Sequence, residues 1–250
     1  MAGARTQEDE VFDDDFRYFH EVMCPPARTE AEVRSINDLI DEHRRGSVSV
    51  LDLGCGWGRL TNRLASPPYN FNVLGVDIQD AYLRSAKTDG PAEYVRQDIR
   101  HLDLERKFDV AINWNTGFSY YSDEVNESIL RRAADHLVPG GLLLLDIIAY
   151  DYVVRYFREF MEVRRGDDVQ TDRLSWDAPT SRLRQWRDIS RDGRRSSFFF
   201  ETRLYPASEM HGLLGRVGLT TTAVLDERGA DYSRDSSRLV VVAVKRSRSA

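Results

Sequence analysis

The sequence predicts an α/β fold in which a mostly parallel sheet is covered by helices on both faces. Between residues 48 and 148, short apolar runs alternate with helical patterns, the rhythm typical of parallel strands joined by helices. The first apolar run leads into a glycine-rich loop at residues 54–58 and then into a helix. Two further strand-like runs, residues 220–226 and 238–245, close the chain.

The predicted core spans residues 45–150, and its elements follow from these patterns in order. Apolar runs predict strands at residues 48–53, 71–77, 93–97, 108–113 and 142–148. Helical patterns lie between them at residues 59–65, 81–87 and 124–136. Pro139, Gly140 and Gly141 are expected to form the turn that closes the last of these helices.

An N-terminal region of residues 1–44 is expected to begin with a disordered tail, residues 1–11, and to continue as a helical lid. An aromatic stripe at helical spacing predicts the first helix and consists of Phe12, Phe16 and Phe19. The Pro25-Pro26 pair ends it. A second helix is expected over residues 29–43, with Thr29 as its N-cap.

The sequence pattern changes after residue 150, and residues 151–205 are predicted to form an inserted antiparallel sheet. A helix at residues 151–160 is expected to precede strands at residues 169–176, 182–189 and 195–205. Asp192-Gly193 between the last two is a hairpin signal. Residues 206–250 then return to the core, with a helix at residues 206–217 before the last two strands.

Composition and charge narrow the classes of function. The chain has 35 basic and 41 acidic residues, a net charge of −6, which argues against a main affinity for nucleic-acid phosphates. The longest apolar run, residues 142–149, is too short to span a bilayer, and residues 1–15 lack a signal pattern. Cys24 and Cys55 show no disulfide or metal-binding spacing. We expect a cytoplasmic protein that uses no metal, membrane or nucleic-acid partner.

The loop after the first predicted strand suits close approach of a ligand. Gly54, Gly56 and Gly58 leave backbone amides accessible at a strand-to-helix turn. The dinucleotide-binding fingerprint needs a third glycine at position 59, where this chain has Arg59, so a hydride-transfer enzyme is disfavoured. Asp52 adds a carboxylate beside the loop, which repels a pyrophosphate and attracts an ammonium or sulfonium group.

Two further carboxylates follow the second and third predicted strands. Asp77 ends the second strand, where an acid can accept hydrogen bonds from both hydroxyls of a ribose. Asp98 follows the third strand, where it could accept from an adenine amino group while Ile99 covers the ring. The simpler alternative for Asp52, Asp77 and Asp98 is that each caps the helix or loop after it.

Together these segments resemble the class I, seven-stranded S-adenosylmethionine-dependent methyltransferases. The resemblance rests on VLDLGCGWG, VD, QD, FDV and LVPGG at residues 50–58, 76–77, 97–98, 108–110 and 137–141. It implies a doubly wound seven-stranded sheet and S-adenosyl-L-methionine as the cofactor. Trp57 stands where the family often has Thr or Ser. The implied cofactor-binding residues are Asp52, Gly54, Cys55, Gly56, Trp57, Asp77, Ile78, Asp98, Ile99 and Asn113.

Residues 114–121 and the aromatic N-terminal helix narrow the acceptor. They resemble small-molecule methyltransferases that act on natural products, amino sugars among them. The likeness implies a helix that closes over the cofactor, an insertion that lines the substrate pocket, and a homodimer. Asn113 is not followed by the Pro-Pro-Tyr/Phe of amino-base methyltransferases, so a nucleobase acceptor is not expected. Substrate-binding residues are predicted at Phe16, Phe19, Trp114, Tyr120 and Tyr121.

The chemistry of methyl transfer suggests which residues act in it. The enzyme must hold acceptor, methyl carbon and sulfur in line. An amine acceptor needs no strong base, whereas a hydroxyl needs one, and the candidates are Tyr18, His20, His101, His136 and His211. Aromatic faces can stabilise the cationic charge. The predicted catalytic residues are Tyr18, His20 and Phe118.

The sequence therefore predicts a methyltransferase acting on a nitrogen, or an oxygen, of a small polar metabolite such as an amino sugar or natural-product intermediate. One alternative is an RNA or protein methyltransferase, favoured by a basic cluster that also fits a solvated sheet face: Arg182, Arg184, Arg187, Arg191, Arg194 and Arg195. Another is a cofactor-binding protein without catalysis, which the intact set of acids disfavours.

Overall fold

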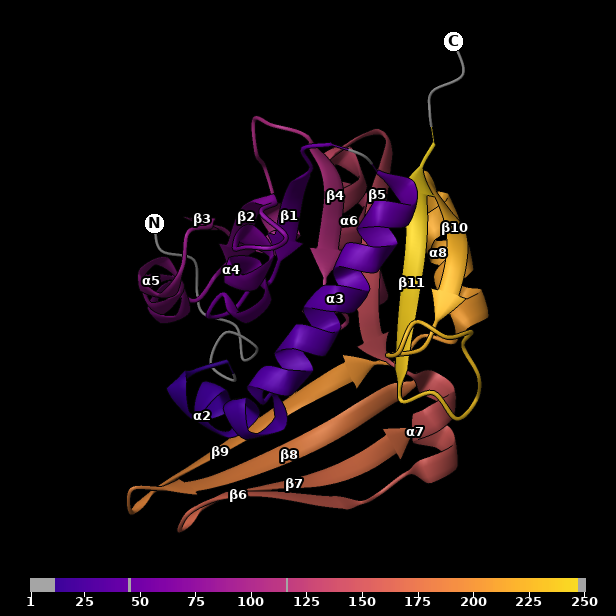
Figure 1. The fold of residues 1–250 in the computed structure, drawn as a ribbon. Coiled ribbons are helices and arrows are strands. Elements are labelled where there is room, and N and C mark those ends of the chain that lie inside the picture. Colours follow the sequence, from indigo (N-terminus) through magenta and orange to yellow (C-terminus); the bar gives the residue numbers. More distant parts are fainter. Residues whose placement is uncertain (1–11, 45, 116, 247–250) are drawn as a thin grey trace.

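The structure, a computed structural model, describes residues 12–44, 46–115 and 117–246. Over these residues, seven strands form one sheet in the order β10-β11-β5-β4-β1-β2-β3, and four strands form a second (Figure 1). Strand β11 runs antiparallel to both neighbours, and the pairs from β5 to β3 are parallel. The predicted fold class is confirmed. The disorder predicted for residues 1–11 lies outside the described residues.

The elements of the large sheet follow the predicted order with small shifts at their ends. Its strands are β1 (Ser49–Leu53), β2 (Asn72–Asp77), β3 (Glu93–Arg96), β4 (Phe108–Asn113), β5 (Leu137–Ile148), β10 (Leu219–Leu225) and β11 (Arg238–Lys245). The helices are α2 (Asp14–Met23), α3 (Pro26–His43), α4 (Arg59–Ala65), α5 (Asp80–Asp89), α6 (Asp123–Asp135), α7 (Tyr150–Tyr156) and α8 (Ala207–Arg216), with the short 3-10 helix η1 (Ile99–His101). None of the described helices is long and apolar enough to cross a membrane.

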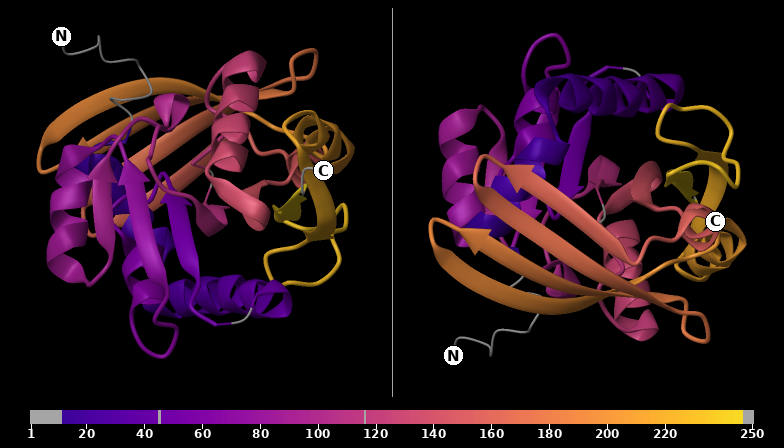
Figure 2. Two further views of the ribbon diagram at one scale, coloured as in Figure 1. Left: turned by 90° about the horizontal axis from the view of Figure 1, so that it is seen from above. Right: turned by 90° about the horizontal axis from the view of Figure 1, so that it is seen from below.

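Strand residues alternate between two apolar cores because successive side chains point to opposite faces of a sheet. Val50 packs with α3 and α4 on one face, whereas Leu51 packs with α6 and α8 on the other. Both faces are therefore covered, as the near-continuous apolar strands require. Figure 2 shows the helices on either side of the sheet. This double layer fixes the ends of the parallel strands, where the candidate site lies.

Three of the predicted boundaries are corrected by the structure, and one strand is added. Helix α3 begins at Pro26 rather than Thr29, because a proline fits the first turn, and the Thr29 hydroxyl accepts from Arg59 at 2.9 Å instead. Strand β5 begins at Leu137, and residues 138–141 form an irregularity in its pairing with β4 rather than a separate turn. Helix α7 ends at Tyr156. An unpredicted strand then begins at Phe160.

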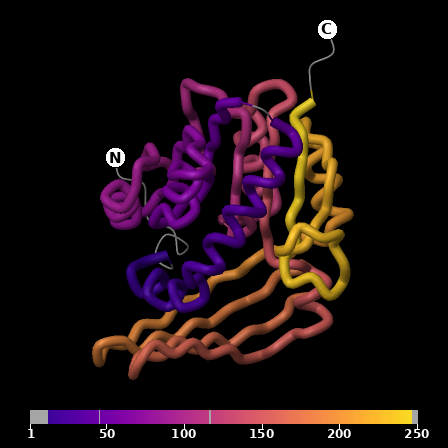
Figure 3. The backbone as a smooth tube through the Cα atoms, in the orientation of Figure 1, coloured from indigo at the N-terminus to yellow at the C-terminus, as the bar shows by residue number. Residues whose placement is uncertain are grey.

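The second sheet is the predicted antiparallel insertion. It lies beyond the C-terminal ends of β4 and β5 (Figure 1). Its strands are β6 (Phe160–Arg165), β7 (Asp168–Asp177), β8 (Arg182–Arg191) and β9 (Arg194–Arg203), in that order. The backbone trace brings α2 beside the hairpin ends of this sheet (Figure 3). On its inner face, Arg187 and Asp172 form a buried ion pair at 2.8 Å, and Gln170 donates to the same carboxylate.

Removing Asp172 should destabilise the protein strongly. The Asp172→Ala variant leaves the Arg187 guanidinium buried without its charge partner, which costs about 3–5 kcal/mol. Urea denaturation would measure this loss. The control is Asp188→Ala on the exposed face of the same sheet, where the change should stay within about 0.5 kcal/mol. Similar losses for both variants would contradict a stabilising role for the buried pair.

Candidate active site

The glycine loop between β1 and α4 is tied to the neighbouring strand. The amides of Gly54 and Cys55 both donate to the Val76 carbonyl, at 2.8 and 3.0 Å. Gly56 has a φ of 56°, and a Cβ there would meet no atom within 4 Å, so its backbone faces open space. A Cβ at Gly58 would lie 2.8 Å from that of Ala86, so the helix start needs glycine for room. The loop is therefore a fixed backbone surface.

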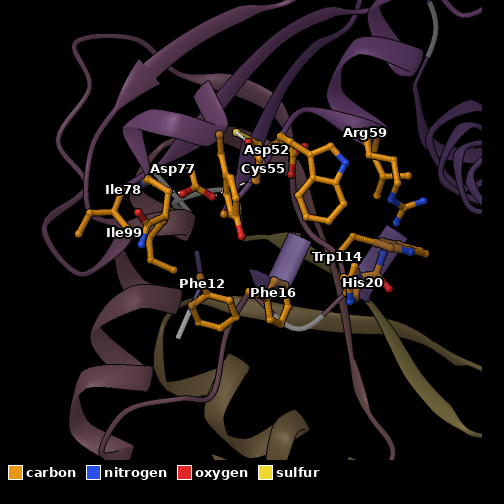
Figure 4. Close-up of a pocket in the computed structure, with 18 of the residues that line it drawn as sticks. Phe12, Phe16, His20, Asp52, Cys55, Arg59, Asp77, Ile78, Ile99 and Trp114 are labelled. Atoms are coloured by element: carbon orange, nitrogen blue, oxygen red, sulfur yellow. Dashed lines mark hydrogen bonds between the residues drawn. The ribbon is translucent and has the colours of Figure 1, made fainter. Parts of the chain in front are cut away.

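Three carboxylates stand at the ends of consecutive strands around this loop. Asp52 in β1 is buried and accepts from the Thr61 hydroxyl at 2.6 Å. Asp77 at the end of β2 accepts from the amides of Gly56 and Gln79, each at 2.8 Å. Asp98 after β3 pairs with Arg100 at 2.7 Å. The first two lie close to each other in the pocket (Figure 4).

The electrostatics of these acids favour a cationic ligand at Asp52. Burial raises the pKa of Asp52 to about 6, and the nearby charge of Asp77 adds to the rise while the Thr61 hydrogen bond opposes it. Burial also raises the pKa of Asp77, although its backbone hydrogen bonds oppose the rise. Burial acts in the same sense on Asp98, but its bonds to Arg100 outweigh it and lower the pKa. A bound ammonium would therefore stabilise the ionised form of Asp52.

Aromatic side chains close the pocket on the side opposite these acids. Phe12, Phe16 and His20 line it from the N-terminal segment and α2 (Figure 4). The Phe16 and His20 rings stack with centroids 5.1 Å apart, and the Trp57 ring meets His20 edge-on at 5.7 Å. Tyr82 packs edge-on against Trp57 at 5.6 Å. The cofactor loop and the N-terminal helix thus share one aromatic enclosure.

His20 is held as a neutral imidazole. Burial is the main reason that its pKa falls to about 4, and the charges of Arg59, Arg28, Arg187 and Arg238 lower it further. Its Nε2 lies 3.3 Å from the Cys24 sulfur. At neutral pH this ring can donate one hydrogen bond and accept another, but it is too weakly basic to remove a proton from a hydroxyl.

Next to the glycine loop, two arginines share a single carboxylate. Glu32 of α3 pairs with Arg59 at 2.6 Å and with Arg28 at 2.8 Å. Arg28 also donates to the side-chain oxygen of Asn115 at 2.9 Å, and the backbone N–H of Asn115 donates to the Asp146 carboxylate at 2.9 Å. Arg59 and Asn115 line the pocket. The surplus positive charge of this group suits a carboxylate, such as the one carried by an amino-acid ligand.

The far end of the pocket is formed by the segment after β4. Trp114, Tyr120 and Tyr121 line it. The Tyr120 ring meets Phe12 edge-on at 5.1 Å, and burial raises the pKa of its hydroxyl to about 12, so it remains a neutral phenol. Among the described residues, no hydrogen-bond partner occupies that hydroxyl. It is therefore available to a bound molecule.

Most residues predicted for the site are brought together around this pocket. The predicted residues that line it are Asp52, Gly54, Cys55, Gly56, Trp57, Asp77, Ile78, Asp98, Ile99, Phe16, His20, Trp114, Tyr120 and Tyr121. Sequence reasoning did not assign to the site Phe12, Arg59, Leu60, Gln79, Tyr82, Asn115 and Gly117. Phe12 could have been found from the aromatic stripe, and Arg59 from its place directly after the loop.

Four predicted residues do not line the pocket. Phe118 and Phe19 are fully buried, and Phe118 stacks on Tyr205 in the core with centroids 5.8 Å apart. Tyr18 lies against the insertion, where its hydroxyl donates to Asp168 at 2.8 Å. Asn113 is buried behind the loop and donates to the Leu53 carbonyl at 2.7 Å. The structure therefore gives no support to catalytic roles for Tyr18 and Phe118, or to substrate contact by Phe19.

The other histidines considered as bases also lie outside the pocket. His136 is buried between α6 and β4, where Nε2 accepts from the Leu104 amide at 2.9 Å and Nδ1 lies 2.7 Å from the Arg132 carbonyl. His101 and His211 are exposed. None of these three lines the pocket, so their predicted role as bases is not supported.

Comparison with known proteins agrees with this geometry. Residues 50–141 match the family described as a methyltransferase domain. The malonyl-[acyl-carrier protein] O-methyltransferase of Bacillus anthracis is 26% identical over 129 residues, 50% of this chain and 47% of that protein. The chain thus spans about half the length of the curated relatives it matches.

Two solved structures share the fold over most of the chain. A S-adenosylmethionine-dependent methyltransferase from Clostridium acetobutylicum superposes with a TM-score of 0.81 and 19% identity, covering 93% of this chain and 99% of its own. CalS10, an amino pentose methyltransferase from Micromonospora echinaspora, superposes with a TM-score of 0.71 and 19% identity, covering 92% and 96%. At this identity the likeness establishes the fold alone.

The resemblance to class I S-adenosylmethionine-dependent methyltransferases is confirmed by these findings. The fold is that of the class, and residues 50–141 form a methyltransferase domain. At the level of this domain, the predicted enzyme class, a methyltransferase, agrees with the family match as well.

Removing the Asp77 carboxylate should weaken cofactor binding. Asp77→Ala removes the acceptor of the Gly56 amide and the predicted partner of the ribose, and hydrogen bonds to a charged group contribute about 1.5–3 kcal/mol. We expect the Kd for S-adenosylhomocysteine to rise roughly 10- to 100-fold in calorimetry. Asp80→Ala, three residues later and exposed, is the control and should bind normally. An unchanged affinity for Asp77→Ala would remove the ribose assignment.

Cofactor affinity should also fall in acid. The Asp52 pKa of about 6 in the ligand-free pocket means that its charge is lost as the pH drops through 6, and with it the attraction for an ammonium group. Calorimetry with S-adenosylhomocysteine should give weaker binding at pH 5 than at pH 7.5, with proton release on binding near pH 6. Asp52→Asn should reduce that proton release. Identical affinities at both pH values would contradict the assignment.

Proposed function

We propose that this protein is an S-adenosylmethionine-dependent methyltransferase that methylates a nitrogen of a small ring-shaped acceptor, which binds as a neutral amine. The observation that carries the proposal is that the strand-end acids Asp52, Asp77 and Asp98 line one pocket together with aromatic side chains of α2. Asp52 and Asp77 lie across this pocket from Phe12 and Phe16 (Figure 4). The acids suit the cofactor, and the enclosure leaves a confined space beside it. This deepens the prediction from sequence, which left nitrogen and oxygen open.

The residues present fit the cofactor. When bound, S-adenosylmethionine would supply a methyl group made electrophilic by its sulfonium. Asp52 would hold the ammonium and the Arg28–Glu32–Arg59 group the carboxylate. Asp77 would hold the ribose, and Ile78 and Ile99 would cover the adenine. Asn113, predicted to bind the cofactor, lies behind the same loop and supports it through its hydrogen bond to the Leu53 carbonyl.

The titratable groups around the enclosure favour an amine over a hydroxyl. A hydroxyl must lose its proton as it attacks, yet neutral His20 and the phenol of Tyr120 are poor bases. A neutral amine attacks with its own lone pair and needs only orientation. The arginines that lower the pKa of His20 would also disfavour an ammonium, so the same field supports the reactive form of the amine. The structural likeness to an amino pentose methyltransferase supports this choice.

A macromolecular acceptor fits less well. The basic cluster that kept this alternative open is largely ion-paired: Arg182 pairs with Asp123, Arg184 with Asp177, Arg187 with Asp172 and Arg191 with Asp15. Arginines already neutralised in this way offer little charge to a phosphate backbone. An enclosed acceptor site also suits a small molecule better than a chain.

A methyl-transfer assay tests the proposal. The purified protein is incubated with methyl-labelled S-adenosylmethionine and matched pairs of ring compounds that carry an amine or a hydroxyl at one position, amino sugars included. We expect label in the amines, with a rate that rises with pH as the amine loses its proton and no inflection from His20 between pH 6 and 8. His20→Gln should keep this pH profile. Transfer to the hydroxyl partners alone would overturn the choice of nitrogen, and cofactor binding without transfer would favour the non-catalytic alternative.

A further inference from the structure

The Tyr18 side chain points away from the pocket and contacts the insertion. Its ring lies between two guanidinium groups, with the Arg191 carbon 4.0 Å and the Arg165 carbon 4.2 Å from the ring centroid. Its hydroxyl donates to Asp168 at 2.8 Å. One side chain of α2 therefore contacts three residues from three strands of the insertion.

These partners lie at the ends of two hairpins. Arg165 and Asp168 flank the turn between β6 and β7, and Arg191 precedes the turn between β8 and β9. The Asp192 amide donates to the Asp168 carboxylate at 3.0 Å, so the two hairpin ends are joined. Tyr18 thus sits where both hairpins meet, and we refer to Tyr18, Arg165, Asp168 and Arg191 as the clamp.

Ion pairs on either side extend the clamp along α2. Arg191 pairs with Asp15 at 2.7 Å, and Arg165 pairs with Glu21 at 3.1 Å. Arg165 also donates to the Tyr18 carbonyl at 2.8 Å. The helix is therefore fastened to the insertion over two turns, from Asp15 to Glu21.

The opposite face of α2 carries the side chains that close the pocket. Phe16 and His20, four residues apart, share one face of the helix, and Tyr18 lies between them on another. On this inner side Arg17 donates to Ser85 at 2.8 Å and its guanidinium lies 5.5 Å from the Trp57 ring centroid. The helix therefore bridges the methyltransferase core and the insertion.

We propose that Tyr18 is a positioning residue that fastens α2 to the paired hairpin ends of the insertion and thereby holds Phe16 and His20 over the bound cofactor. None of the described residues of the insertion lines the pocket, so its task in this proposal is to set how fast the cofactor product leaves. The inference rests on the proposed function for the identity of the bound molecule. The fastening itself does not depend on it.

Dissociation of S-adenosylhomocysteine tests this role. Release is followed by stopped-flow fluorescence of the pocket residues Trp57 and Trp114 in the wild type, Tyr18→Phe, Tyr18→Ala and Val22→Ala. Loss of two cation–π contacts and a hydrogen bond should make release from Tyr18→Ala roughly tenfold faster. Tyr18→Phe keeps the ring and its two cation–π contacts but loses the hydrogen bond to Asp168, so its release rate should lie between those of wild type and Tyr18→Ala. Val22→Ala, an exposed position on the same helix, is the matched control and should match wild type.

A second variant and a second readout keep the outcome clear. Arg191→Gln alters the clamp from the insertion side, and in the double variant with Tyr18→Ala the two accelerations of release should combine to less than their product, because both changes remove the contact between Tyr18 and Arg191. Hydrogen exchange of the α2 amides in ligand-free protein should quicken in Tyr18→Ala but not in Val22→Ala. Wild-type release and wild-type exchange in a folded Tyr18→Ala protein would overturn the proposal. If the wild type bound no S-adenosylhomocysteine, the proposed function would fail, and the exchange measurement would still decide the clamp.

Discussion

A buried carboxylate, Asp52, and a half-buried one, Asp77, at the ends of adjacent parallel strands are the constraint on which the site depends. Because β1 and β2 are parallel and in register, Asp52 and Asp77 reach the same edge of the sheet. Neither can be surrounded by water, and burial raises the pKa of both. The backbone amides of Gly56 and Gln79 satisfy Asp77, whereas within the described parts of the chain Asp52 accepts a side-chain hydrogen bond from the Thr61 hydroxyl alone. A desolvated acid with so few donors is a site prepared for a cation.

The rest of the pocket extends this arrangement in two directions. On the side of α3, Arg28 and Arg59 share Glu32, which leaves a net positive charge that suits a carboxylate. Through Arg28, the same group is hydrogen-bonded to Asn115 after β4. Toward the insertion, aromatic rings replace charges, and the cationic groups behind them are paired with acids. The pocket is therefore lined by charged groups at one end and by neutral aromatic rings at the other. A charged cofactor and an uncharged nucleophile would be separated by this change of environment.

Particular residues show how far the sequence could lead. Asp52, Asp77 and Asp98 were predictable because each follows an apolar run, and strand ends of a parallel sheet meet at one edge. Phe16 and His20, predicted as substrate-binding and catalytic residues, do line the pocket, but their neighbours Tyr18 and Phe19 on the same helix point elsewhere. When both faces of a helix pack against other elements, helical spacing alone does not predict which element each face contacts. Phe118 sits in an aromatic segment whose other members line the pocket, yet it turns into the core.

By itself, the sequence determined the sheet, the loop and the acids beside it, since these depend on local apolar periodicity, glycines and strand ends. The tertiary structure alone decided which aromatic residues face the ligand and which bind the insertion. It also decided that Arg59, which the sequence used only to exclude a dinucleotide, lines the pocket with Glu32 as its partner. Such roles arise from contacts between segments far apart in the chain. Their geometry exists only once the helices and the second sheet have packed against the first.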